Sequence, residues 1–368
     1  MRCDNCSTRL LLILISTAFA KKCYSFILPS SSTLFGTCTS NACQARYSGH
    51  NRFTQRLISR KAATTATEID TETISVALPS NWKEVDDNWS LQAAEILTRY
   101  GVVALTSSNS DNAGLISARV IDEANKSATS RLQDMQSRIT NRGVDPNGIE
   151  DGPFRFAEII CRDEGGLRYD VPLPWLGGGI DSGESDTNGD FGSGRIGAPL
   201  KRMETKGVTG LHEAIDEIVP NILEALWSKD EDDNDNSNIE NHQSSSYVAA
   251  SGFLINKPGS KDQNWHKDGP DAGFIDCFVP LVDLNKDLGP TAFLLNDGED
   301  ELVPMLNKGN ILLFDYRTIH RGQGNTSENT TRTLAYAVYR RRERRRDGTK
   351  RESGDVHNFP AALTLEYD

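Results

Sequence analysis

Three residues in the C-terminal third of the chain have side chains of the types that bind transition metals. His266 and Asp268 form an H-x-D pair, and His320 follows fifty-two residues after Asp268. Two imidazoles and one carboxylate can occupy one face of an octahedral ion, which leaves three positions open and suits non-haem Fe(II) that binds a co-substrate and O2 together. A catalytic zinc ion is more often four-coordinate and needs one open position. We therefore predict a metal site at these three residues that suits Fe(II), with zinc as the alternative.

Arg332 lies twelve residues after His320, on what is expected to be the next strand. A guanidinium group is planar and permanently charged, so it binds a carboxylate through two parallel hydrogen bonds. Such a group can hold the far carboxylate of 2-oxoglutarate while the keto-acid end chelates the iron. Arg332 therefore favours an iron centre with an acidic co-substrate over a zinc hydrolase.

The H-x-D pair is a weak signal by itself, because six histidines and 52 acids in 368 residues give about one H-x-D or H-x-E pair by chance. Its surroundings are more specific. Roughly residues 247–340 resemble the phytanoyl-CoA dioxygenase family of Fe(II)/2-oxoglutarate oxygenases, in the order and spacing of QNWHKDG (263–269), GPT (289–291), KGNILLFDYRTIHRG (308–322), Asn325 and Arg332. The family's Pro-Gly-Ser-His run is here Leu-Asn-Asp-Gly at 295–298.

The resemblance implies a role for each residue named so far. By it, His266, Asp268 and His320 are iron ligands, Arg332 binds the co-substrate, and the fold is a double-stranded β-helix. It also implies that 2-oxoglutarate is decarboxylated to succinate and CO2 while a C–H bond of a small-molecule or lipid-like substrate is hydroxylated. Related halogenases replace the carboxylate ligand with a small residue, so an intact Asp268 favours hydroxylation or a related oxidation.

Two other classes of function remain open on sequence alone: a non-catalytic, cupin-like binding module that keeps the metal site, and a metal-dependent hydrolase. His212-Glu213 does not form the H-E-x-x-H zinc motif, because position 216 is Asp, and a solvated helix face is expected there. Arg155, Arg168 and Tyr169 could line the substrate mouth or form structural ion pairs. Trp265 could pack beside His266 or be an ordinary core tryptophan.

The elements that position the site fall into a helical part and a strand-rich part. Apolar periodicity predicts helices over 90–100 and 116–139, and an amphipathic helix over 211–226 that Pro220 interrupts. Short strands are expected at 102–105, 154–161, 168–171, 247–255, 275–284, 291–295, 310–314 and 333–339. Residues i and i+2 of a strand share a face, so His266 and Asp268 are expected to reach one ion from a strand, and His320 from a partner strand.

These elements predict an α+β fold with a mainly β core, a double-stranded β-helix (a jelly-roll or cupin-like barrel) with flanking α-helices. We expect a single oxygenase domain over 68–340. It comprises a helical part over 68–228, an acidic disordered loop over 229–246 and the jelly-roll core over 247–340. A basic extension over 341–368 follows, read as a solvated continuation of the last strand, with a nucleic-acid patch or nuclear-localisation signal as the alternative.

The first 67 residues carry nine Lys/Arg against one acid, Asp4. Arg9 and the apolar run over 10–20 have the layout of a signal peptide, too short for a resident membrane span, whereas 21–67 is acid-free and Ser/Thr-rich like a transit peptide. The joint between them, STAFA at 16–20, resembles the cleavage motif of bipartite plastid-targeting sequences. We expect a plastid enzyme with no membrane span in the mature protein, the secretory pathway being the alternative.

Charge and cysteine use support this expectation. The overall net charge of −12 leaves residues 68–368 strongly acidic once the basic leader is set aside, so no nucleic-acid partner is expected. Five of the seven cysteines lie in the leader, and the two that remain, Cys161 and Cys277, are too few for a disulfide framework. Glycans at the N-x-S/T sites of Asn325 and Asn329 would crowd the active-site mouth, which disfavours secretion.

Overall fold

The computed structural model describes residues 70–79, 81–83, 88–108, 114–147, 159–163, 165–173, 206–228 and 246–341, all within the unit Lys61–Asp368. The two predicted leader segments, the acidic loop up to residue 245, Arg155 and the chain beyond Arg341 lie outside the described residues. What was predicted for them stays a prediction.

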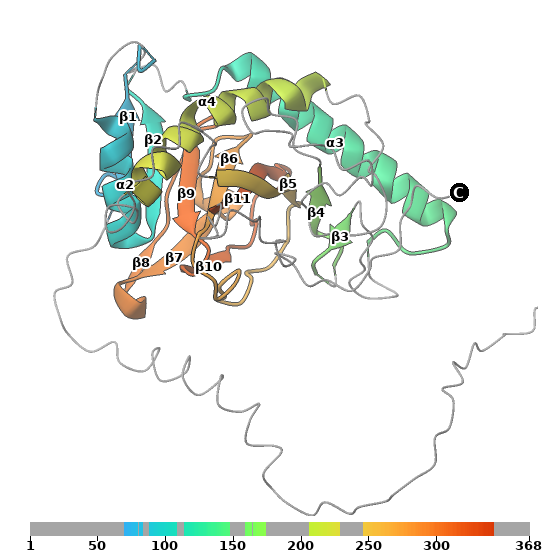
Figure 1. Cartoon of the computed structure of the whole chain (residues 1–368). Coiled ribbons are helices and arrows are strands. Elements are labelled where there is room, and N and C mark those ends of the chain that lie inside the picture. Colours follow the sequence, from blue (N-terminus) through green and yellow to red (C-terminus); the bar gives the residue numbers. More distant parts are fainter. Residues whose placement is uncertain are drawn as a thin grey trace, which may run out of the picture. The chain divides into compact units, whose positions relative to one another are not determined.

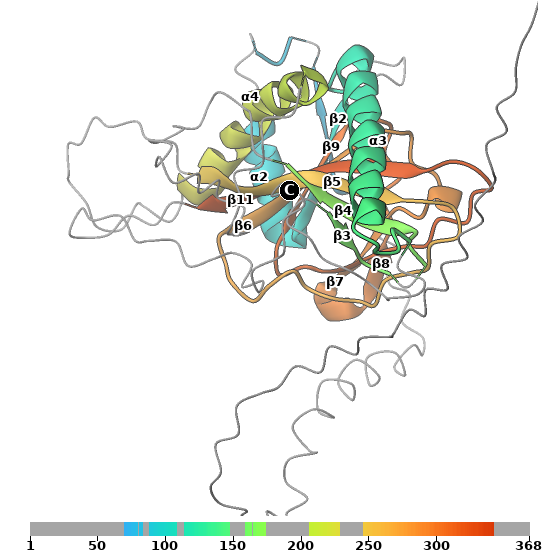
Figure 2. The same cartoon turned by 90° about the vertical axis from the view of Figure 1, so that its right-hand side faces the viewer.

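Three α-helices occur in the described part of the chain: α2 (Trp89–Tyr100), α3 (Ala118–Asn141) and α4 (Lys206–Ser228). Each buries one apolar stripe in a common core with the large sheet, as the periodicity predicted. None of the described helices has the length and apolar character needed to cross a membrane. Figures 1 and 2 show α3 and α4 on one side of the large sheet, with strands β7 and β8 on the other.

Two predictions for α4 were wrong. The helix runs through Pro220 without interruption. Pro220 removes one backbone hydrogen bond, but the fully buried apolar residues on both sides of it, such as Val219 and Ile222, keep the helix on the sheet. His212 does not lie on a solvated face: it is 3% exposed, and burial lowers its pKa to about 3.

The strands form two sheets. The larger has the order β1 (Ser75–Leu78), β2 (Val102–Ser107), β9 (Ile311–Asp315), β6 (Phe274–Pro280), β11 (Arg332–Arg341), β5 (Ser246–Asn256), β4 (Arg168–Pro172) and β3 (Ile160–Cys161). The smaller has the order β10 (Ile319–Gly322), β7 (Thr291–Leu295) and β8 (Asp300–Leu302). Neighbouring strands are antiparallel except for β1 and β2, which are parallel.

The fold is thus mixed α and β with a large sheet, and the mainly β C-terminal part is confirmed. The described strands make two sheets and no closed barrel, an arrangement consistent with a jelly-roll. Strands β1 and β8 were not predicted, since they have only four and three residues. Strand β10 is the strand from which His320 was expected to come, although its bounds were not predicted. The strand predicted over 275–284 ends at Pro280, and of that predicted over 154–161 the structure describes only the end, as β3.

The alternation along β11 defines two faces of the large sheet. Ala335, Ala337 and Tyr339 pack into the core shared with the helices, whereas Leu334 packs with Phe293 of the smaller sheet. We call the face that carries Leu334 the inner face, because it lies against the smaller sheet. Arg332 is two residues before Leu334, so it also belongs to the inner face.

Candidate metal centre

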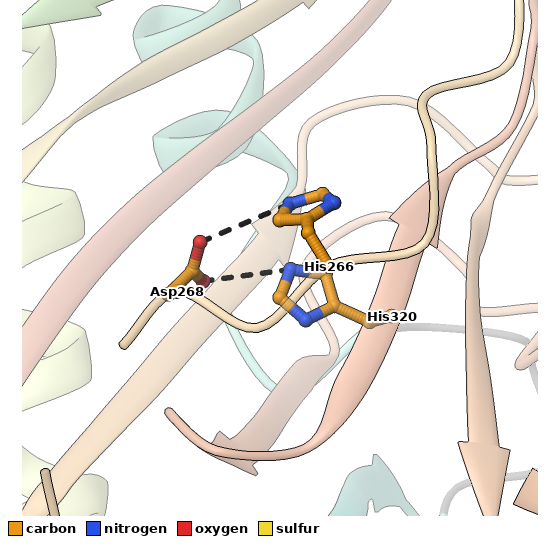
Figure 3. A group of neighbouring side chains, drawn as sticks. All are labelled: His266, Asp268 and His320. Atoms are coloured by element: carbon orange, nitrogen blue, oxygen red, sulfur yellow. Dashed lines mark ion pairs between the residues drawn. The ribbon is translucent and has the colours of Figure 1, made fainter. Parts of the chain in front are cut away.

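His266, Asp268 and His320 come together in the structure (Figure 3), with one ligand atom from each within 4.8 Å of the others. The Nε2 atom of His266 lies 3.9 Å from Oδ1 of Asp268, and that of His320 lies 3.4 Å from Oδ2. Within the described residues this is the one group of three such side chains close enough to share an ion. The structure therefore brings together the three residues that the sequence predicted as ligands, and their role as iron ligands stays a prediction.

The backbone brings the two histidines together through an isolated antiparallel bridge between His266 and His320. The N–H of His266 donates to the carbonyl of His320 at 3.0 Å, and the reverse bond is 2.9 Å. Asp268 lies in the loop that follows, where its N–H donates to the carbonyl of Tyr316 at 3.1 Å. The prediction that His266 and Asp268 share one face of a strand was therefore wrong, since the strand pairing is a single bridge and a loop turns the carboxylate toward the imidazoles.

The Nδ1 atom of each imidazole lies within hydrogen-bond distance of a backbone carbonyl. Nδ1 of His266 lies 2.7 Å from the carbonyl oxygen of Asn264, and Nδ1 of His320 lies 3.0 Å from that of Thr318. A carbonyl accepts only from a protonated nitrogen, so the hydrogen of each neutral ring is assigned to Nδ1. The Nε2 lone pairs are left facing Asp268, the arrangement a metal ion requires.

The three ligands differ in burial. His320 is 4% exposed and lies among aromatic rings, with its centroid 4.9 Å from that of Phe314 and 6.0 Å from that of Phe293. Burial is the main cause that lowers the pKa of His320, which favours the neutral imidazole that binds metals. The side chains of His266 and Asp268 are 36% and 32% exposed, so the site opens on their side.

Asp276 is a residue of the site that sequence reasoning missed. It lies on β6, is 3% exposed, and its carboxyl group interacts with that of Asp268. Burial, together with the charges of Asp268 and Asp315, raises its pKa well above the usual value for an aspartate. A protonated Asp276 can donate to Asp268 and fix the orientation of that carboxylate. The only signal in the sequence was an acid inside an otherwise apolar strand.

Arg332 begins β11 and is 2% exposed. Its Nη1 donates to the carbonyl of Gly289, and its buried Nε has no hydrogen-bond partner among the described residues. The amide of Asn256, with its oxygen turned toward the guanidinium groups, accepts from Nη2 of Arg332 at 2.9 Å and from both Nη atoms of Arg168 at 3.2 Å. Burial and the nearby Arg168 lower the pKa of Arg332 to about 9, so it stays charged at neutral pH.

Arg168 and Tyr169 turn out to be structural rather than mouth-lining. Arg168 is 4% exposed and donates to the carbonyls of Lys261 at 2.7 Å and Gln323 at 3.2 Å. The hydroxyl of Tyr169 donates to the carbonyl of Pro146 at 2.8 Å on the helical side of the sheet. Trp265 is half-buried and stacks against Arg321, whose Cζ lies 4.5 Å from the ring centroid, so it is no core tryptophan.

The loop between His320 and Arg332 is organised by Asn325, which is fully buried. Its Nδ2 donates to the carbonyls of Asn256 at 3.0 Å and Thr330 at 2.8 Å. Its Oδ1 accepts from the N–H of Ser327 at 3.1 Å and from the hydroxyl at 2.6 Å. The amide thus ties the loop to the end of β5, beside Arg332.

No family model matches the chain, but comparison with individual proteins finds similar enzymes. The curated Dioxygenase hkm4 of Aspergillus hancockii is 28% identical over 116 residues, which cover 25% of this chain and 38% of that protein. The non-haem α-ketoglutarate-dependent carbocyclase SnoK and epimerase SnoN of nogalamycin biosynthesis are 12% and 16% identical, with TM-scores of 0.39 and 0.38. The matches cover 70% of this chain and 85% of SnoK, and 69% of this chain and 83% of SnoN.

The chain is thus similar over part of its length to a curated dioxygenase, and similar to solved structures of two α-ketoglutarate-dependent enzymes. AviO1 of Streptomyces viridochromogenes Tue57 is also similar, at 12% identity and a TM-score of 0.38 over 68% of this chain and 93% of that one. The chain matches well under two thirds of the length of its curated relative, and the structural scores are low. The function proposed below therefore rests on the geometry of the residues.

Proposed function

We propose that this protein is an Fe(II)- and 2-oxoglutarate-dependent dioxygenase that uses O2 to hydroxylate a C–H bond of a small-molecule or lipid-like substrate, with release of succinate and CO2. The observation that carries the proposal is the combination of a His/Asp/His centre with a buried arginine that has no carboxylate partner among the described residues. We also propose that the two sheets are the halves of a double-stranded β-helix.

The donor set fits Fe(II). Two Nε2 atoms with free lone pairs and one carboxylate can bind one face of the ion and leave the other face for co-substrate and O2. When bound, Fe(II) supplies the redox chemistry that couples decarboxylation of the co-substrate to oxidation of the substrate. The chain holds both imidazoles by backbone carbonyls and the carboxylate by Asp276, so the three ligands are oriented before the ion binds.

Arg332 fits the co-substrate. A charged group that is 2% exposed and unpaired is costly to bury, so the fold is expected to supply an anion for it. Among the described residues no carboxylate pairs with Arg332, and its Nε hydrogen is unused. The distal carboxylate of 2-oxoglutarate would provide both the missing charge and an acceptor.

The two alternatives make different predictions. A non-catalytic, cupin-like module would bind a metal without turnover and has no need for a buried guanidinium. A metal-dependent hydrolase would contain zinc after purification, and its activity would not change when O2 is removed. Retention of all three ligands together with Arg332 favours the oxygenase.

The test is succinate release by the full chain incubated with Fe(II), 2-oxoglutarate and O2. We expect slow turnover even without primary substrate, abolished by removal of O2 or iron, and a visible charge-transfer absorption band when 2-oxoglutarate is added anaerobically. If the purified protein with added iron gives neither succinate nor binding of 2-oxoglutarate, the oxygenase proposal fails. If succinate is released, comparing the masses in a metabolite extract before and after incubation with the enzyme would identify the primary substrate.

We further propose a plastid destination, supported by the signal-like segment 1–20 followed by the acid-free segment 21–67. The test is to fuse residues 1–67 to a fluorescent protein and express the fusion in a cell whose plastid proteins carry bipartite targeting sequences. Fluorescence in the plastid stroma is expected, whereas fluorescence in the medium would indicate the secretory pathway.

A further inference from the structure

Arg162 is a cation that the proposed reaction leaves unexplained. It follows β3, and its Nη2 donates to Oδ2 of Asp170 at 2.6 Å. The side chain of Asp170 is 2% exposed, whereas that of Arg162 is 39% exposed. Among the described residues the guanidinium has this one hydrogen-bond partner, so its other N–H donors are available to a ligand.

Asp170 holds this guanidinium over the inner face of the sheet. In the register of β4, β5 and β11, Asp170 lies opposite Leu254, which lies opposite Leu334. Residues directly opposite one another project from the same face, so Asp170 shares the face of Leu334. The hydroxyl of Tyr336, on the same face of β11, donates to Oδ1 of Asp170 at 2.9 Å. Both oxygens of Asp170 are therefore engaged, one by Arg162 and the other by Tyr336.

Tyr336 connects this group to the metal centre. It packs against a small cluster that includes Tyr316. The carbonyl of Tyr316 accepts from the N–H of Asp268 at 3.1 Å, and the ring of Tyr316 lies so close to Gly269 that it leaves no room for a Cβ there. Burial opposes the charge of Arg162, but Asp170, Tyr336 and Asp268 together raise its pKa, so the guanidinium lies within electrostatic reach of the metal ligand.

Arg162 and Arg332 suit different ligands. Arg332 is 2% exposed, so it can bind only a group that becomes enclosed, as a co-substrate does. The side chain of Arg162 is 39% exposed, comparable to the 36% and 32% of His266 and Asp268, so all three can be reached by a ligand from solvent. A guanidinium fixed by one carboxylate still presents N–H donors in set directions, and these bind carboxylate or phosphate oxygens.

We propose that Arg162 binds an anionic group, a carboxylate or a phosphate, on the primary substrate, which places the carbon to be oxidised between Arg162 and the metal centre. The substrate class is therefore an acid. This proposal rests on the proposed function for the reaction itself, but the anion site can be tested without turnover.

The experiment uses the full chain loaded with Mn(II), an ion that carboxylate ligands accept and whose paramagnetism relaxes nearby nuclei. Saturating 2-oxoglutarate keeps small anions away from Arg332 and the metal. The probes are inorganic phosphate, followed by phosphorus relaxation, and acetate, followed by methyl proton relaxation. The variants are Arg162→Gln, Arg162→Lys and the matched control Arg119→Gln, whose side chain is 79% exposed on α3.

We expect Mn(II) in the wild type to relax at least one probe, and Arg162→Gln to weaken its apparent affinity about tenfold, the effect of losing one hydrogen bond to a charged group. The apparent affinity of Arg162→Lys should lie between those of the wild type and Arg162→Gln, and the affinity of Arg119→Gln should equal that of the wild type. The probe that responds tells carboxylate from phosphate. The proposal is overturned if neither probe is relaxed in the wild type, or if a probe is relaxed equally in the wild type and in Arg162→Gln. A weaker affinity of Arg162→Gln for 2-oxoglutarate would also overturn it.

Failure of the proposed function gives a different result from failure of the anion site. If the wild type does not bind Mn(II) in a spectroscopic titration, the metal centre is wrong. Calorimetric titration of the metal-free chain with phosphate and acetate then decides the anion site: tenfold weaker binding in Arg162→Gln supports it, and unchanged or absent binding removes it.

Discussion

His266 and His320 are joined backbone to backbone by a pair of hydrogen bonds of 3.0 and 2.9 Å, although neither residue extends this pairing into a longer ladder. Three residues before His266, the N–H of Gln263 donates to the carbonyl of Gly322 at 2.9 Å, and the side-chain oxygen of Gln263 accepts from the N–H of Gly322 at 3.0 Å. The first histidine therefore depends on the strand that carries the second. A change in either segment is expected to affect metal affinity as well as local stability.

His320→Ala is expected to abolish specific binding of Fe(II) or Mn(II), because two ligands in a partly exposed loop do not hold the ion. Mn(II) titration followed by electron paramagnetic resonance measures this loss. The matched control is Lys267→Ala, since Lys267 lies between the other two ligands with an exposed side chain. Metal affinity of His320→Ala equal to that of Lys267→Ala would contradict the site.

Arg332→Gln is expected to raise the dissociation constant of 2-oxoglutarate about a hundredfold while Mn(II) still binds, since a buried charge-assisted pair contributes on the order of 3 kcal/mol or more. Anaerobic titration of the iron-loaded protein gives the constant. Arg332→Lys keeps the charge but not the two parallel donors, and it should restore only part of the affinity. If both variants bind 2-oxoglutarate as the wild type does, another residue binds its carboxylate.

Asp276→Asn and Asp276→Ala should differ. The raised pKa of Asp276 favours its protonated form, and the amide of Asn supplies a donor to Asp268 similar to that form. We expect Asn to keep metal affinity near that of the wild type, and Ala to lower it about tenfold, as is usual when support for a metal ligand is removed. Equal metal affinities in the two variants would mean that Asp276 does not orient Asp268.

Stability should depend on the protonation of His212. Its folded pKa of about 3 lies below the value of 6.5 expected in the unfolded chain, so below pH 6.5 the unfolded state binds a proton that the folded state does not. Lowering the pH below 6.5 should therefore reduce the free energy of unfolding, and His212 should contribute up to about 1.4 kcal/mol per pH unit to this loss. Chemical unfolding of the wild type and of His212→Leu between pH 5 and 6.5 measures the difference. The slope of the variant should be smaller, and equal slopes would show that His212 titrates normally.

Gly101→Ala should weaken both stability and metal binding. Gly101 ends α2 with φ of 72°, and an added Cβ would lie 2.6 Å from Oγ1 of Thr318, whose carbonyl accepts from His320. Gly143 is the matched control, because its φ is 77° but nothing lies within 4 Å of an added Cβ. Gly143→Ala should cost about 1 kcal/mol of unfolding free energy, and Gly101→Ala clearly more. Only Gly101→Ala should also lower the affinity for Mn(II).

Much of the site could be predicted because the order and spacing of the residues around the H-x-D pair are specific. Six histidines leave few ways to build a two-imidazole centre, and Arg332 stands out by its spacing from His320. The long amphipathic helices and the longer strands could be located from their periodicity, since burial of one face imposes it. The end of α2 was also predictable, because Gly101 adopts the left-handed conformation.

The rest depends on contacts between distant segments, which a local pattern does not encode. The three- and four-residue strands β8 and β10 form only because partners are already in place. His212 looked solvated because a histidine beside an acid is typical of an exposed face, whereas the helix turns it into the core. Asp276 and Arg162 gain their roles from Asp268 and Asp170, which are eight residues away in sequence in both cases and come close only in the fold.

Asn325 has a consequence for how the protein reaches its destination. An oligosaccharide is attached to Nδ2 of an asparagine, and in the folded chain both hydrogens of this atom are engaged with the carbonyls of Asn256 and Thr330. The Asn-Thr-Ser acceptor sequence is therefore open to glycosylation only before the loop closes. A sugar added to the unfolded chain during passage through the endoplasmic reticulum would prevent closure, so the modification state of Asn325 records whether the chain folded before or after it met the glycosylation machinery.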